Sequence, residues 1–192
     1  MNQNNNEIIE KQTDQSARLF DQWLESGAQG SFTISEEITG PDDLTRMLFA
    51  GSPWRRLKQA WRGFCAYLGS LTSFSGWKAF WFRRAGAKIG RNVCLAPGVA
   101  IDTLLPHLIS IEDEAVLGPG SMIHAHLKTS EGVVVGRVRI GQYSVVGART
   151  VVGNTVTVGA QGVLGSCSFF FNGMVPENGM FTGAPAVVRN AA

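Results

Sequence analysis

Residues 140–169 decide the fold, and they read IGQYSV, VGARTV, VGNTVT, VGAQGV and LGSCSF. Each of these five contiguous hexads begins with Ile, Val or Leu and carries Gly at its second position. Neither the period of 2 typical of a strand nor the period of 3.6 typical of a helix produces this spacing. A period of six is typical of a chain that coils as a triangular prism, with one short strand on each face.

The same repeat begins earlier in the chain. Eleven hexads start with an aliphatic residue, at positions 89, 95, 101, 111, 117, 123, 140, 146, 152, 158 and 164. We expect this side chain and the small fifth residue to fill the interior, while Gly or another small residue turns the corner. Three hexads make a coil of roughly 18 residues, and stacked coils pair as parallel strands about 4.8 Å apart. The repeat therefore predicts a mainly β fold of nearly four coils.

Charge divides the chain of 192 residues. Residues 1–43 hold nine acids and two bases, whereas residues 44–101 hold ten bases and no acid. All five Trp precede residue 82, and most of the 23 Gly lie from residue 86 onward. We therefore expect an α-helical N-terminal region over 1–85 and a repeat domain over 86–192. A charged fraction of 17% without long like-charge runs argues against a disordered chain and against a nucleic-acid partner.

In the N-terminal region, residues 1–12 are polar and expected to be disordered. Apolar spacing predicts helices over 14–26 and 53–68, with a loop over 28–40 and a further helix that starts at Pro41. Residues 54–84 mix Trp and Phe with Lys and Arg. Such a stretch either packs on the following domain, the commoner case, or lies in a membrane interface beside anionic lipid.

Three features bear on location. The three Cys are scattered, the N-terminus lacks a basic start followed by an apolar run, and no stretch has the roughly 18 apolar residues of a spanning helix. These features predict a cytoplasmic protein, with peripheral contact at the inner face of the membrane as an option.

The hexads resemble those of the hexapeptide-repeat acyltransferases over residues 80–190. FRRAGAKIGRNVCLAPGVAI (82–101) is similar to the entry segment of the capsule and colanic-acid type acetyltransferases. IEDEAVLGPGSMIHAHL (111–127) and GRVRIGQYSVVGARTVV (136–152) resemble that group and the hexapeptide domain of polylysine-synthetase-like enzymes. VPENGMFTGAPAVVRN (175–190) resembles the family's closing segment. The resemblance implies a left-handed parallel β-helix, a homotrimer, acetyl-CoA or another acyl-CoA as co-substrate, no metal, and a role in polysaccharide biosynthesis.

The three His are His107, His124 and His126. Acyl transfer from a thioester to a hydroxyl or amine needs a base with a pKa near neutrality, which suits His. The resemblance matches the catalytic His to His126, which follows a G-P-G-x-x-I hexad and precedes a loop excursion near 127–138. If residues 123–127 are extended, His124 points the same way as His126. Either is then a candidate base, or one orients the other.

Other roles follow from the same resemblance. Donor binding is implied for small residues of the later coils and for the closing segment, namely Gly147, Ala148, Gly165, Ser166, Gly183, Ala184 and Arg189. Asp102 and Glu112 are candidate contacts for the acceptor. One departure is Phe169–Phe171, which stands where relatives carry a V-V-x-K-D-like segment. These rings are expected to plug or extend the last coil, or to line the acyl end.

The first hypothesis is therefore a CoA-dependent acyltransferase, with acetyl as the expected group and a saccharide or related small molecule as the acceptor. O- versus N-transfer stays open, as does free CoA versus an acyl carrier protein as donor. A metal-dependent hydratase of the γ-carbonic-anhydrase type uses the same prism, but its ligand spacing is not reproduced. A non-enzymatic β-solenoid scaffold attached through residues 44–84 is the third hypothesis.

Overall fold

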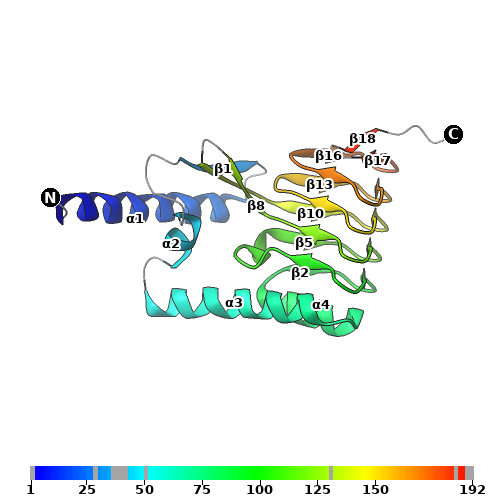
Figure 1. Cartoon of the computed structure of the whole chain (residues 1–192), viewed down its shortest axis with the longest axis horizontal. Helices are drawn as coiled ribbons and strands as arrows, with labels where there is room; N and C mark the ends of the chain where they lie inside the picture. The colour runs from blue at the N-terminus through cyan, green and yellow to red at the C-terminus, as the bar shows by residue number, and fades with distance from the viewer. Residues whose placement is uncertain are drawn as a thin grey trace.

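Figure 1 shows the computed structural model of the chain, in which helices lie beside and beneath a stack of short strands. The structure describes residues 3–27, 30–35, 43–49, 52–129, 132–183 and 186–188. In this part of the chain, no helix has both the length and the apolar character needed to cross a bilayer.

Three parallel sheets form the faces of a prism. The first sheet contains β2 (Lys88–Ile89), β5 (Ile109–Ile111), β10 (Val138–Ile140), β13 (Val156–Val158) and β16 (Gly173–Val175). The second contains β3 (Cys94–Leu95), β6 (Val116–Leu117), β11 (Val145–Val146), β14 (Val163–Leu164) and β17 (Met180–Gly183), with β18 (Ala186–Val188) antiparallel to β17. The third contains β4 (Ala100–Ile101), β7 (Met122–Ile123), β12 (Val151–Val152) and β15 (Phe169–Phe170). The chain visits the sheets in this order in each of the four coils that begin with β2, β5, β10 and β13.

The aliphatic first positions fill the interior of the prism, as the repeat predicts. Ile140, Val146, Val152 and Val158 are all completely buried. The small fifth positions complete the same layers, and the Ser144 hydroxyl satisfies its hydrogen-bonding need by donating to the Gly141 carbonyl oxygen at 2.6 Å. The core is therefore a column of aliphatic side chains along the prism axis.

Gly or another small residue was expected to turn the corners, and Gly98 and Gly120 do so, but larger residues stand at most of the other corners. The residue with positive φ is the fourth of the hexad, as at Asn92 (53°), Tyr143 (56°) and Arg149 (54°). The second-position Gly is instead required by coil stacking, because a Cβ on Gly141 would lie 2.7 Å from the carbonyl carbon of Gly159. The left-handed conformation costs a non-Gly residue at the fourth position roughly 1–2 kcal/mol. Gly nevertheless stands at the second position, so close stacking of the coils matters more there than backbone strain at the fourth.

The N-terminal region holds more regular secondary structure than expected. The helix α1 spans Gln3–Ser26 and so includes residues 3–12 of the segment expected to be disordered. No Gly or Pro stands between Gln3 and Ser26 to stop the helix. The segment 28–40 was expected to be a loop, but it contains β1 (Ser31–Ser35), which pairs antiparallel with β9 (Gly132–Gly136). Pro41 lies outside the described residues, and α2 spans Asp43–Phe49.

The chain leaves the prism after β7, as the predicted excursion near 127–138 requires. The excursion is a hairpin rather than an irregular loop, formed by β8 (His126–Thr129) and β9. With β1 it makes a three-stranded antiparallel sheet beside the prism, in the order β1-β9-β8. A smaller break after β4 holds the 3-10 turn η2 (Pro106–Leu108). Both breaks fall between the third sheet and the first.

Two helices cover the end of the prism at the first coil. The longer one, α3 (Pro53–Leu71), begins with Ser52 as its N-cap and Pro53 at its first position, and α4 (Ser75–Ala85) ends at Gly86 with φ of 104°. Both run along the base of the strand stack (Figure 1). The apolar stripe of α3 does not face the prism, since Trp54 and Leu57 are 79% and 61% exposed. The expectation that the stretch 54–84 packs on the following domain therefore fails for these large apolar side chains, although Cys65 and Phe82 are buried.

Candidate active site

The breaks in the prism bring three candidate residues to one corner, where the chain passes from the third sheet to the first. Asp102 directly follows β4, and His124 directly follows β7 in the next coil. The register is fixed because Ile101 pairs with Ile123 in the parallel sheet. His126 is the first residue of β8. We call this part of the molecule the His126 corner.

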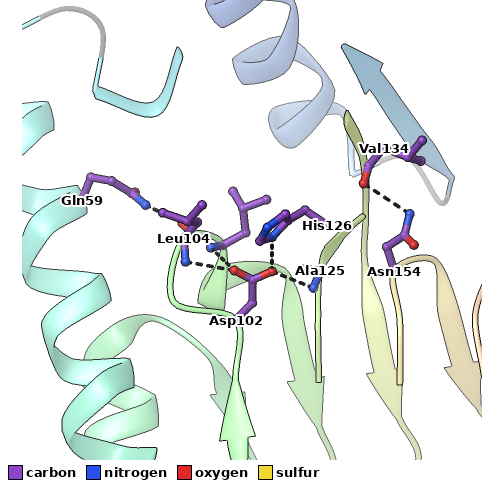
Figure 2. A network of polar contacts seen from close by, with 8 residues as sticks. Gln59, Asp102, Leu104, Ala125, His126, Val134 and Asn154 are labelled. Atoms are coloured by element: carbon purple, nitrogen blue, oxygen red, sulfur yellow. Dashed lines mark hydrogen bonds and ion pairs between the residues drawn. The ribbon is translucent and has the colours of Figure 1, made fainter. Parts of the chain in front are cut away.

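His126 is held by Asp102 (Figure 2). Its Nδ1 atom lies 2.5 Å from Oδ2 of Asp102. The same Oδ2 accepts from the backbone N–H of Ala125 at 2.9 Å, while Oδ1 accepts from the N–H groups of Leu104 (2.9 Å) and Leu105 (3.1 Å). Since a carboxylate oxygen accepts, Nδ1 carries the hydrogen, and Nε2 remains as the basic nitrogen.

The side chains of His126 and Asp102 differ in their exposure to solvent. The Asp102 side chain is completely buried, whereas the His126 side chain is 29% exposed. Asp102 therefore cannot meet an acceptor in this chain, contrary to its sequence-based assignment as an acceptor contact. Its geometry is that of a residue that fixes the tautomer and orientation of an imidazole.

The pKa values reflect this pairing. Burial alone lowers the pKa of His126, but the hydrogen bond that it donates to Asp102 and the negative charge of Asp102 outweigh that effect and leave the pKa raised above 6.5. Burial raises the pKa of Asp102, but the hydrogen bond and charge of His126 and two backbone N–H donors leave it lowered below 3.8. The corner thus pairs a carboxylate whose pKa is lowered with an imidazole whose pKa is raised, so each partner favours the charged form of the other.

His124 and His107 lie near the same corner but differ from His126. Residue Ala125 is a bend, so residues 123–127 are not continuously extended as the expectation for His124 assumed. Burial lowers the pKa of His124, and the Asp102 charge only partly opposes this effect. Burial also lowers the pKa of His107 to about 4, aided by the charge of Arg62, whose Nη1 lies 3.4 Å from His107 Nδ1. Both rings are therefore held neutral, and the orienting partner of His126 is Asp102.

Two further polar side chains support the corner (Figure 2). Gln59 of α3 donates from Nε2 to the carbonyl oxygen of Leu104, in the turn that holds Asp102. Asn154, which is buried, donates from Nδ2 to the carbonyl oxygen of Val134 in β9 at 3.4 Å. Sequence reasoning missed both residues, because neither the helix nor the excursion can be placed against the corner from the repeat alone.

The expected donor-binding residues lie elsewhere. Gly147, Ala148, Gly165 and Ser166 follow β11 and β14, at the corner between the second sheet and the third. Gly183 ends β17 at the same corner, and Ala184 and Arg189 lie outside the described residues. A Cβ on Gly147 would clash with the backbone of Ser166, so coil stacking alone requires Gly there. Within one chain, the residues expected to bind the donor therefore lie at a different corner of the prism from His126.

Glu112 is separated from His126 as well. It follows β5, at the corner between the first sheet and the second, where Oε1 accepts from Arg139 Nε at 2.6 Å. It lines an open cleft of about 550 Å³ together with Lys88, Arg91, Ser110 and Gln142. Within the described residues, no three His, Cys, Asp or Glu side chains gather as a set of metal ligands.

Solved structures of the same fold identify the class of architecture. One is a hexapeptide-repeat-containing acetyltransferase from Vibrio cholerae O1 biovar eltor in complex with acetyl coenzyme A, at TM-score 0.59 and 16% identity, covering 77% of this chain and 97% of that one. Another is a galactoside acetyltransferase in complex with coenzyme A, at TM-score 0.55 and 18% identity over 70% and 80% of the two chains. A third is a maltose O-acetyltransferase from Clostridium difficile 630, at TM-score 0.53 and 17% identity over 69% and 87%.

Sequence comparison, in contrast, finds no matching family model and no matching curated protein. At identities below 20%, the structural likeness establishes the fold. The domain is a left-handed parallel β-helix with N-terminal helices, as the resemblance of the hexads implies.

Proposed function

We propose that this protein is an acyltransferase that moves an acetyl or other short acyl group from CoA to a hydroxyl or amine of a saccharide or related small molecule. The observation that carries the proposal is the His126 imidazole, partly exposed and held by a buried carboxylate beside the hairpin that leaves the prism. The names of the similar structures agree with it, since they describe acetyltransferases, two of them bound to acetyl coenzyme A or coenzyme A.

The chemistry follows from the tautomer. Nε2 of His126 accepts the proton of the acceptor hydroxyl or amine as that oxygen or nitrogen attacks the thioester carbonyl carbon. The C–S bond then breaks, and the thiolate of CoA takes the proton from the imidazolium. The ionised Asp102 stabilises that imidazolium while it exists, which is the role that a buried carboxylate performs for a base in acyl transfer.

The donor site completes the proposal. The small residues proposed to contact the donor lie at a different corner from His126, so a second copy of the chain must bring its own corner to the His126 corner. This need supports the homotrimer that the sequence resemblance implies. A role in polysaccharide biosynthesis and kinship with the capsule and colanic-acid type enzymes rest on that resemblance alone, and a cytoplasmic location rests on the sequence features given above.

Thermal unfolding with acetyl-CoA tests donor binding. A ligand that binds only the folded state stabilises that state, by about 2.7 kcal/mol when its concentration is 100 times its Kd. This stabilisation raises the unfolding temperature. We expect acetyl-CoA to raise the unfolding temperature of the wild type and of His126→Ala alike, because the imidazole acts on the acceptor. Absence of any shift in the wild type would contradict the proposal and favour a scaffold.

A further inference from the structure

The helix α3 exposes its large apolar side chains. Its side toward the protein carries the polar Gln59 and small residues such as Cys65 and Ala66, and Gly63 there approaches the carbonyl oxygen of Thr103. Its other side is apolar and exposed, at Trp54, Leu57, Trp61, Phe64, Tyr67 and Leu71. A surface helix of a globular protein normally buries its apolar stripe, so this stripe is placed to meet something outside the chain.

The exposed stripe continues onto the second helix. Phe74, at the N-cap of α4, and Trp77 and Phe80 within it are 76%, 62% and 43% exposed. Gly76, Trp77 and Phe80 line an open hollow of about 400 Å³. The stripe of α3 and these three residues of α4 together form what we call the aromatic face, on the helices that lie across the end of the prism (Figure 1).

Cations border the aromatic face. At about 100° per residue, Arg56 and Lys58 fall on opposite edges of the stripe of α3, and both are exposed. The guanidinium of Arg84 lies 5.4 Å from the ring centroid of Phe80. Residues 44–101 contain no Asp or Glu. On the inner side, by contrast, Arg55 pairs with Asp21 at 2.9 Å. The exposed cations Arg56, Lys58 and Arg84 thus add positive charge along the edge of the aromatic face.

From these observations we infer that the aromatic face docks on an anionic lipid surface. Trp, Tyr and Phe beside Lys and Arg are the residues that place an amphipathic helix in the plane of a membrane interface, with the rings at the headgroup level and the cations on lipid phosphates. A second copy of the chain is a poorer partner, because a two-fold contact sets the same patch against itself. Such a contact would gather Arg56, Lys58 and Arg84 of both copies in one interface, to which residues 44–101 supply no acid.

Vesicle co-sedimentation of the full chain tests this inference without reference to the acyl transfer. We expect binding to vesicles of phosphatidylcholine and phosphatidylglycerol in equal amounts, and weaker binding to phosphatidylcholine alone or at high salt. The triple variant Trp54→Ser, Trp61→Ser and Trp77→Ser should bind the anionic vesicles roughly tenfold or more weakly. The triple variant Arg56→Gln, Lys58→Gln and Arg84→Gln should lose the preference for anionic lipid. Tyr143→Ser, an exposed aromatic residue of a prism corner, is the matched control and should bind as the wild type does.

Two readouts keep the test decisive. The replaced side chains are exposed, so the urea midpoint of each variant should stay near that of the wild type, and quenching of Trp fluorescence by brominated lipid reports contact directly. The inference is overturned if the wild type binds neither kind of vesicle, or if the Trp variant binds as tightly as the wild type. It is also overturned if the Trp replacements lower the molar mass in solution instead, since the aromatic face would then be a contact between copies.

Discussion

The Nδ1 atom of His126 lies 2.5 Å from a carboxylate oxygen of Asp102, although 24 positions separate the two residues in the chain. The coil makes them neighbours, because Asp102 and His124 stand one residue beyond the paired positions Ile101 and Ile123. The chain then bends at Ala125, and His126, the first residue of the excursion, contacts the buried carboxylate. A regular repeat thus supplies the acid, and an interruption of the repeat supplies the base.

Replacing Asp102 should change both the rate and its pH dependence. In Asp102→Asn the negative charge that raises the pKa of His126 is gone. We expect the acidic limb of kcat/KM to move to lower pH, because the free imidazole is then deprotonated at lower pH. The plateau should fall by roughly 10²-fold, since the amide no longer holds the required tautomer. A pH–rate profile with acetyl-CoA checks this.

Asp113→Asn is the control for Asp102→Asn, because Asp113 pairs with Arg91 at an exposed corner. Its profile should match that of the wild type. An unmoved acidic limb in Asp102→Asn would show that the carboxylate does not tune the base.

His107 should make the protein less stable in mild acid. Its folded pKa is about 4, against 6.5 in an unfolded chain. The unfolded state therefore binds more protons between these values, and stability falls as the pH falls from 6.5 toward 4. At pH 5 the loss is about 1–2 kcal/mol. Urea unfolding at pH 7 and pH 5 should show that His107→Gln loses less stability than the wild type, and an equal loss in both would refute this origin.

Lys78 joins the helices to the prism. It is completely buried, and its Nζ donates to the carbonyl oxygens of Gly69 (2.9 Å), Ser70 (3.3 Å) and Val99 (3.2 Å). Lys78→Met leaves these three acceptors unpaired and should cost about 3 kcal/mol of unfolding free energy. The exposed Lys88→Met should change it by less than about 0.5 kcal/mol. Equal urea midpoints for the two variants would argue against this anchoring role.

Alanine substitutions at two helical glycines distinguish the effect of packing on stability from the effect of helix propensity. A Cβ on Gly69 of α3 would clash with the ring of Phe82 in α4, whereas one on Gly76 meets no atom within 4 Å. Gly69→Ala should therefore destabilise the protein by about 1–3 kcal/mol. Gly76→Ala should stabilise it by about 0.5–1 kcal/mol, because Ala favours the helix. Thermal unfolding of both variants measures the difference, and a stabilised Gly69→Ala would contradict the helix packing described above.

The repeat predicted the prism because the period of six depends only on local geometry and on one aliphatic side chain per face. It predicted the inward side chains at Ile140 and Val146 for the same reason. It could not assign Asp102, because a polar residue after a strand has the same pattern whether it meets solvent or a buried imidazole. The insertion between Ile101 and Ile111, four residues beyond one hexad, was the available signal that this corner is irregular.

The N-terminal region was harder to predict because tertiary contacts override its local pattern. The segment around Phe32 looks like a loop until it pairs with β9, and its ring then packs against Phe20 with centroids 5.5 Å apart. The stripe of α3 was found from its period, but periodicity does not say which side of a helix faces the protein. Its orientation depends on polar contacts such as that of Gln59 with Leu104.

Acyl transfer from acetyl-CoA tests the central claim most directly. The assay follows release of the CoA thiol with a thiol-reactive dye, using maltose, a galactoside and an amino sugar as acceptors. We predict transfer to at least one sugar by the wild type and a kcat lowered by roughly 10²–10⁴-fold in His126→Ala, with its thermal response to acetyl-CoA retained. Full activity of His126→Ala on an acceptor that the wild type uses would contradict the claim that His126 is the base.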